Sequence, residues 1–140
     1  MTRRRRALAV GGAVLAPALI GLAALLLGAD MRVDMRNGQP PMVVALPLVV
    51  AFALVFALLG WAALAIMERL TARAATVWTV LAVIVLLVSF LPIVAAEASG
   101  GTKGALALMH LAVAAVLIPG LRSSGVARTA GRSPERGAYD

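Results

Sequence analysis

Residues 42–67, MVVALPLVVAFALVFALLGWAALAIM, decide the fold, because these 26 residues contain no Asp, Glu, Lys or Arg. An α-helix rises 1.5 Å per residue, so about 20 residues cross a hydrocarbon core of about 30 Å. Lipid offers the backbone no hydrogen-bond partner, so a spanning segment must satisfy its own N–H and C=O groups. The stretch therefore predicts a membrane-spanning helix that is long enough to tilt.

Three further runs are equally free of charge and equally apolar. They are residues 7–29, 74–96 and 104–121. A β-barrel would instead show segments of about 10 residues in which apolar and polar residues alternate, and the sequence has no such segments. The predicted fold class is all-α, a transmembrane four-helix bundle between a basic segment at residues 1–6 and a tail at residues 122–140.

The composition supports a membrane protein and excludes several kinds of chemistry. The chain has 140 residues, of which 62% are hydrophobic and 14% charged, whereas soluble domains average about 45–50% and about 25%. It has no Cys and one His, which excludes thiolate sites and a cluster of His ligands within one chain. We find no nucleophile–base pair and no phosphate-binding glycine loop, so we expect no metal, no cofactor and no enzyme activity.

The distribution of basic residues predicts the orientation. The two chain ends and the loop between the second and third runs carry ten Lys and Arg, against three in the other two loops. Cytoplasmic loops carry this excess, so we expect both termini in the cytoplasm and the chain in the plasma membrane. The residues expected to anchor the bundle at the cytoplasmic interface are Arg3, Arg4, Arg5, Arg6, Arg69, Arg73 and Trp78.

Both ends of the chain are basic. The first run is longer than the 7–15 apolar residues of a signal peptide and lacks a clear A-x-A site, which favours an uncleaved anchor over a cleaved leader. The tail is rich in Arg, Ser, Gly and Ala and is expected to be disordered. The net charge is +7, and the basic residues that produce it flank the membrane spans. We therefore expect anionic lipid headgroups, and no nucleic acid, as partners of these residues.

The first loop, residues 30–41, is expected to be extended. Asp30 and Asp34 alternate with two arginines, which gives like charges at helical spacing but alternating signs along one face of a strand. Asn37-Gly38 supplies a turn signal. We expect one arm of a small hairpin with a ladder of surface salt bridges, in preference to a cation site.

Prolines and small residues occur within the apolar runs. Pro17 and Pro92 are expected to bend their helices, and Pro119-Gly120 is expected to end the fourth helix. Small residues are so frequent that they favour packing within one bundle over a specific dimer contact.

His110 is the only titratable side chain within a run, which makes it a candidate for function. The third and fourth runs form an antiparallel pair, so Ser89 lies at the same depth as His110. We expect a neutral His110 that bonds across helices to Ser89 or to a freed backbone carbonyl. The alternative is proton exchange at His110, assisted by Glu97 and Lys103 at the outer mouth.

The strings VWTV at 77–80, LALMHL at 106–111 and VLIPGL at 116–121 follow an Arg-rich start. Over residues 6–121 the chain resembles an actinobacterial family of small four-helix integral membrane proteins of unknown function. One Lys among thirteen basic residues fits such a GC-rich genome. The resemblance implies the four-helix fold and assigns no activity to His110 or Pro119.

The sequence leaves two functions open. We expect a non-enzymatic accessory or structural membrane subunit, because the spans carry no charged pathway residues. The alternative is a small oligomeric transporter or channel that uses His110 and the proline bends.

Overall fold

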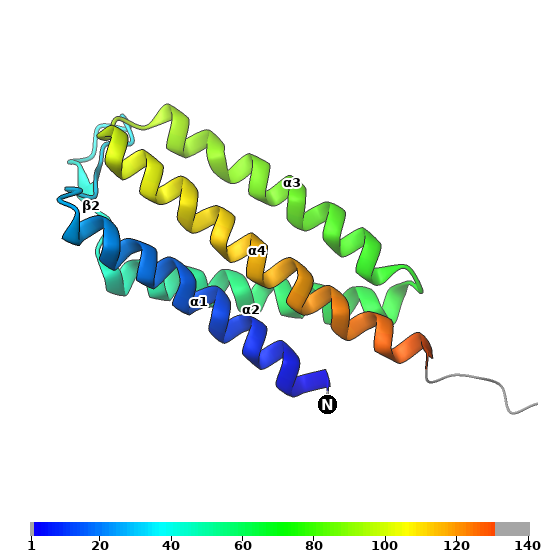
Figure 1. The fold of residues 1–140 in the computed structure, drawn as a ribbon. Coiled ribbons are helices and arrows are strands. Elements are labelled where there is room, and N and C mark those ends of the chain that lie inside the picture. Colours follow the sequence, from blue (N-terminus) through cyan, green and yellow to red (C-terminus); the bar gives the residue numbers. More distant parts are fainter. Residues whose placement is uncertain (1, 131–140) are drawn as a thin grey trace, which may run out of the picture.

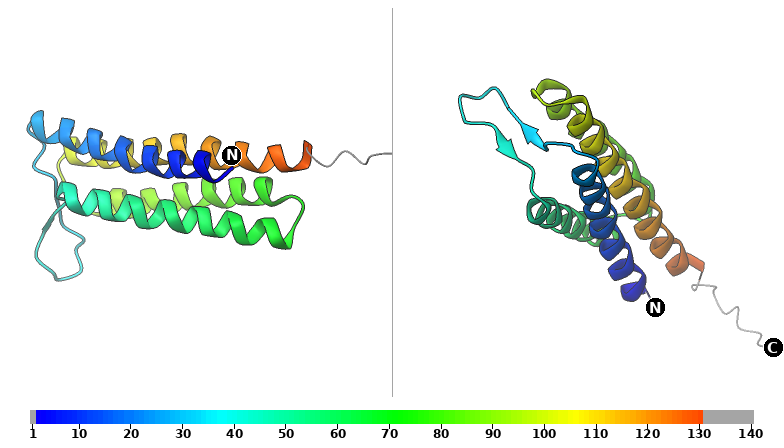
Figure 2. Two further views of the ribbon diagram at one scale, coloured as in Figure 1. Left: turned by 90° about the horizontal axis from the view of Figure 1, so that it is seen from below. Right: turned by 60° about the vertical axis from the view of Figure 1, so that its left-hand side comes forward.

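The structure, a computed structural model, describes residues 2–130, with side chains from Arg3 to Arg122. Its elements, in chain order, are α1 (Thr2–Leu26), β1 (Arg32–Val33), β2 (Met42–Val43), α2 (Leu46–Leu70), α3 (Ala74–Ala95) and α4 (Gly100–Ala130) (Figure 1). The four helices lie side by side as a bundle, as predicted (Figures 1 and 2). α1 packs most extensively on α4 and then on α2, while α3 packs on α4 and α2.

All four helices are long and apolar enough to cross a membrane. The candidate spans are Arg3–Leu26, Leu46–Leu70, Ala74–Ala95 and Gly100–Arg122. The start of α1, the α2–α3 turn and the end of α4 lie at one end of the bundle, which we call the basic end (Figure 1). The hairpin and the α3–α4 loop lie at the other end, which we call the hairpin end. The chain is a multi-pass membrane protein.

The first two helices start at different residues from the predicted runs. α1 begins at Thr2, so the four arginines that follow form about the first turn of this helix. α2 begins at Leu46, because Met42–Val43 are taken up by β2. Pro47 falls in the first turn of α2, where a missing N–H costs no helical bond.

α4 extends beyond its predicted run in both directions. It starts at Gly100, after Ser99, whose Oγ accepts a hydrogen bond from the backbone N–H of Thr102 at 3.2 Å, the pattern of an N-cap. It continues through Pro119 to Ala130, so the prediction that Pro119-Gly120 ends the helix was wrong. Residues 122–130 of the predicted disordered tail are helical, and residues 131–140 lie outside the described residues.

The core consists mostly of small side chains. One buried cluster, centred on Ala13, Ala57, Leu64, Trp78 and Leu121, lies towards the basic end. A second cluster lies towards the hairpin end and contains Met31, Val49, Ala105 and Met109. Large apolar side chains such as Phe52, Phe56, Leu87 and Leu91 are exposed on the outside, which is the arrangement that suits lipid as the solvent.

Two glycines permit the close approach of α1 and α4. A Cβ added to Gly120 would lie 2.6 Å from the Cβ of Ala9, and one added to Gly12 would lie 3.0 Å from Cγ1 of Val116. Gly120 therefore serves as a packing position inside a continuing helix, which explains why it does not act as a cap.

The predicted hairpin in the first loop is confirmed. β1 and β2 pair antiparallel, with Arg32 opposite Val43 and Val33 opposite Met42. Gly38 adopts a φ of +79° in the turn, a conformation that glycine reaches without steric cost. The hairpin projects from the end of the bundle (Figure 2).

Candidate functional site

His110 and Ser89 each bond within their own helix. The Oγ of Ser89 donates to the carbonyl of Leu86 at 2.6 Å. Nδ1 of His110 lies 2.7 Å from the carbonyl oxygen of Leu106, one turn earlier in α4. The expected hydrogen bond between the two side chains is therefore not formed.

The common depth of the two residues is supported by a different contact. The ring of His110 lies 6.2 Å from the ring of Phe90, the neighbour of Ser89 in α3, at an angle of 44°. Because a carbonyl oxygen only accepts, the contact with Leu106 assigns a proton to Nδ1. Nε2 makes no hydrogen bond with the part of the chain that the structure describes, and the ring is half-buried.

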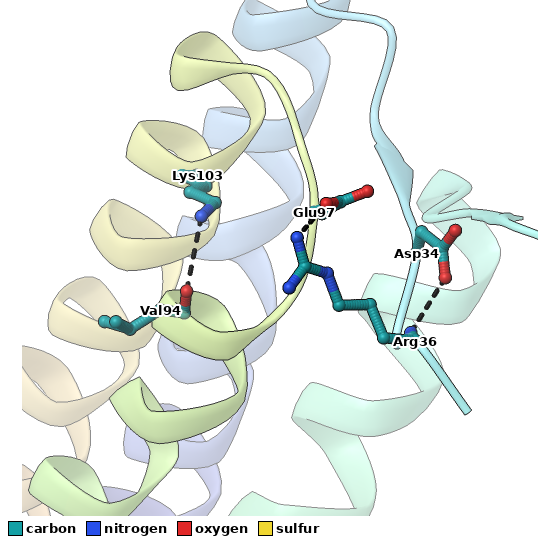
Figure 3. Close-up of polar contacts among 5 residues, drawn as sticks. All are labelled: Asp34, Arg36, Val94, Glu97 and Lys103. Atoms are coloured by element: carbon teal, nitrogen blue, oxygen red, sulfur yellow. Dashed lines mark hydrogen bonds and ion pairs between the residues drawn. The ribbon is translucent and has the colours of Figure 1, made fainter.

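Glu97 belongs to a polar cluster at the hairpin end of the molecule (Figure 3). Its carboxylate pairs with Arg36, and its backbone exchanges two hydrogen bonds of 2.9 Å with that of Asp34. Nζ of Lys103 donates to the carbonyl of Val94 at 3.3 Å, near the end of α3. The contacts of Glu97 tie the hairpin to the α3–α4 loop, and that of Lys103 joins α4 to the end of α3. Both groups that were expected to assist His110 are therefore engaged.

The predicted salt-bridge ladder within the first loop is not formed among the described residues. Asp34 instead accepts a hydrogen bond of 2.8 Å from the backbone N–H of Arg36, whose guanidinium reaches Glu97 on the other loop. The backbone explains the difference, because Arg36 adopts a φ of +52°, which ends the extended conformation that the alternation of charges along one face requires.

Asp30 joins the end of α1 to the start of α4, a contact that sequence reasoning missed. Its Oδ1 accepts hydrogen bonds from the hydroxyls of Thr102, at 2.8 Å, and Ser99, at 3.2 Å. Thr102 is fully buried. The hydrogen bond from Thr102, followed by that from the backbone N–H of Arg32, lowers the pKa of Asp30, because both favour the ionised form.

Arg6 and Glu68 form an ion pair between α1 and α2 at the basic end. Their side chains are only 9% and 12% exposed. The sequence offered one signal, since Glu68 lies among the arginines of that end and is the single acidic residue there whose side chain the structure describes. The partner could not be read from the sequence, because it lies 62 positions away.

The predicted interfacial anchors divide into two groups. Trp78 is 2% exposed, and its indole N–H donates to the carbonyl of Gly60 in α2 at 2.9 Å, so its ring faces the bundle and not the surroundings. Arg6 is likewise buried. The anchors that stay exposed are Arg3, Arg4, Arg5, Arg69 and Arg73.

The interior offers little chemistry. Among the described side chains, Arg6 and Thr102 are the only buried polar ones, and they lie at opposite ends of the bundle. The described residues contain no group of three His, Cys, Asp or Glu that could hold a metal ion. Between the two ends the helices meet mainly through apolar side chains, with the contact of His110 on Phe90 and the hydrogen bond of Trp78 to Gly60 as exceptions.

The comparisons with known proteins identify a family and no activity. Neither the curated proteins nor the solved structures compared with the chain gave a match. Residues 1–127 match the family described as a family of unknown function, DUF6069. That match covers nearly the whole chain, the four helices included, and the chain therefore belongs to the DUF6069 family.

Proposed function

We propose that this protein is a non-enzymatic accessory subunit of a membrane assembly. The observation that carries the proposal is the apolar interior, in which the two buried polar side chains of the described region, Arg6 and Thr102, lie at the ends. A pathway for ions or polar solutes needs polar groups through the middle of the bundle.

The proposed partner surface is the outer face of α3. Among the four candidate spans, this helix has the smallest share of buried residues, namely Ala74 and Trp78. Ile84, Leu87 and Leu91 are all more than half exposed. Lipid covers such a face in a lone bundle, and a partner helix covers it in an assembly.

The orientation is part of the proposal. The basic end carries arginines at the start of α1, around the α2–α3 turn and at the end of α4. We place this end in the cytoplasm, because the cytoplasmic loops of membrane proteins carry an excess of Lys and Arg. The hairpin end then faces outwards from a plasma membrane. The Lys-poor, Arg-rich composition also supports an actinobacterial origin.

One observation favours the second candidate, a small oligomeric transporter. His110 is half-buried in the spanning part of α4, and its Nε2 makes no hydrogen bond to the described residues. That nitrogen could take up a proton if copies of the chain enclosed a path along α3 and α4.

Photo-crosslinking in native membranes tests the accessory role. A photoreactive amino acid replaces Leu87 on α3, and the matched control replaces Leu19 on α1, which has a similar exposed fraction of 57% against 62%. We expect an adduct with another protein from position 87 and lipid adducts alone from position 19.

Two outcomes contradict the proposal. Lipid adducts alone at both positions would mean that α3 has no partner. Adducts between copies of this chain, together with proton flux into vesicles that His110→Ala abolishes, would establish the transporter instead.

A further inference from the structure

A shallow, open groove lies between α1 and α4 near the basic end. Its lining is Arg5, Leu8, Ala9, Val116 and Gly120. The floor of the groove lies where Ala9 and Gly120 bring α1 and α4 together. The side of the groove contains Leu8, which is 66% exposed. The groove therefore faces the surroundings of the bundle and is apolar except at Arg5.

The end of the bundle at which the groove lies is strongly positive. Seven arginines have described side chains at this end, against the single acid Glu68. The seven are Arg3, Arg4, Arg5, Arg6, Arg69, Arg73 and Arg122. Glu68 pairs with Arg6 on the inner side of α1. Because Arg5 carries a positive charge, the ligand that complements the groove is an anion.

We propose that this groove binds one anionic phospholipid, with its phosphate on the guanidinium of Arg5 and an acyl chain along Leu8, Ala9 and Val116. A guanidinium presents several N–H donors in the geometry that suits phosphate oxygens. A soluble phosphate would leave the apolar lining uncovered, and a zwitterionic lipid would bring, beside its phosphate, a choline cation that the arginines at this end repel. The inference does not depend on the accessory role.

Native mass spectrometry of the full-length protein in detergent tests the site. The protein is titrated with phosphatidylglycerol and with phosphatidylcholine of the same acyl chains. We expect one phosphatidylglycerol to bind ahead of all phosphatidylcholine. Arg5→Gln should weaken that binding about tenfold, because it removes charge-assisted hydrogen bonds from the guanidinium to the phosphate.

Arg4→Gln is the matched control for charge, because Arg4 is exposed at the same terminus and does not line the groove. Its effect should stay below about twofold, because Arg4 contributes only long-range attraction that salt screens. Equal losses in the two variants would mean diffuse attraction without a site, and equal binding of the two lipids would also overturn the proposal.

A second pair of variants tests the apolar half. Leu8→Ser should weaken phosphatidylglycerol binding, whereas Leu15→Ser, which changes a similarly exposed residue of α1 outside the groove, should not. Inorganic phosphate should fail to displace the lipid. If phosphate displaces the lipid, or if Leu8→Ser has no effect, the groove binds only an anion, and the proposal that it binds a phospholipid is wrong.

Discussion

Gly120→Ala should destabilise the bundle by forcing α1 and α4 apart. The added Cβ would lie 2.6 Å from the Cβ of Ala9, whereas carbon atoms pack at about 3.5–4.0 Å. Neither atom can rotate away, because each is fixed directly to a helix backbone. The helices must therefore separate locally by about 1 Å to restore ordinary contact.

The expected size follows from two opposing effects. Overpacking a well-packed contact costs about 1–3 kcal/mol, while replacing Gly by Ala inside a helix recovers up to about 1 kcal/mol. We expect a net loss of about 1–2 kcal/mol in the free energy of unfolding. Gly11→Ala is the control for propensity alone, since a Cβ there meets nothing within 4 Å.

The free energy of unfolding can be measured by titrating the protein in mixed micelles with a denaturing detergent. The double variant Ala9→Gly with Gly120→Ala should regain most of the lost stability, because the nearest remaining atom is the Cα of Ala9 at 3.5 Å. If Gly120→Ala is as stable as Gly11→Ala, the close contact described between α1 and α4 is wrong.

Three other predictions concern the polar contacts. Glu68→Ala should cost about 3 kcal/mol of unfolding free energy, since it removes the carboxylate from the buried Arg6; Glu97→Ala, from an exposed pair, should cost less than about 1 kcal/mol in the same assay. Trp78→Phe should cost about 1 kcal/mol for the lost indole hydrogen bond; unchanged stability would contradict that bond. The folded-state pKa of Asp30 lies below its ordinary value of 3.8, so its stabilising effect is present above that pH and is lost as the pH falls through the folded-state pKa. The stability difference between wild type and Asp30→Asn should accordingly close in that acidic range, and a gap that persists there would contradict the assignment.

The helices themselves could be predicted because hydropathy and length are local properties of the sequence. The ends of the helices were harder to predict, because the same residue type can either end a helix or permit close packing within one. Pro119-Gly120 has the composition of a helix stop, yet the missing Cβ of Gly120 is used for contact with Ala9 on α1. Only the position of a distant helix distinguishes the two uses.

At the candidate site, the sequence predicted the depth of His110 in the bundle but not the residue that its side chain faces. Counting residues along two antiparallel helices placed His110 beside the neighbourhood of Ser89, and its ring does approach Phe90. The rotation of each helix about its axis is set by packing throughout the bundle, so the sequence could not tell that Phe90, and not Ser89, faces the ring. The pairing of Arg6 with Glu68 was hidden for the same reason.

The central claim is that the chain crosses the membrane four times, and labelling of single cysteines tests it most directly. The natural sequence has no Cys, so each introduced thiol reports one position. Cysteine in place of Arg4, Thr71 or Arg122 should react with a membrane-impermeant maleimide only after the cells are opened, whereas cysteine in place of Met35 or Gly101 should react in intact cells. Labelling of position 4 and position 122 from opposite faces of the membrane would contradict four crossings.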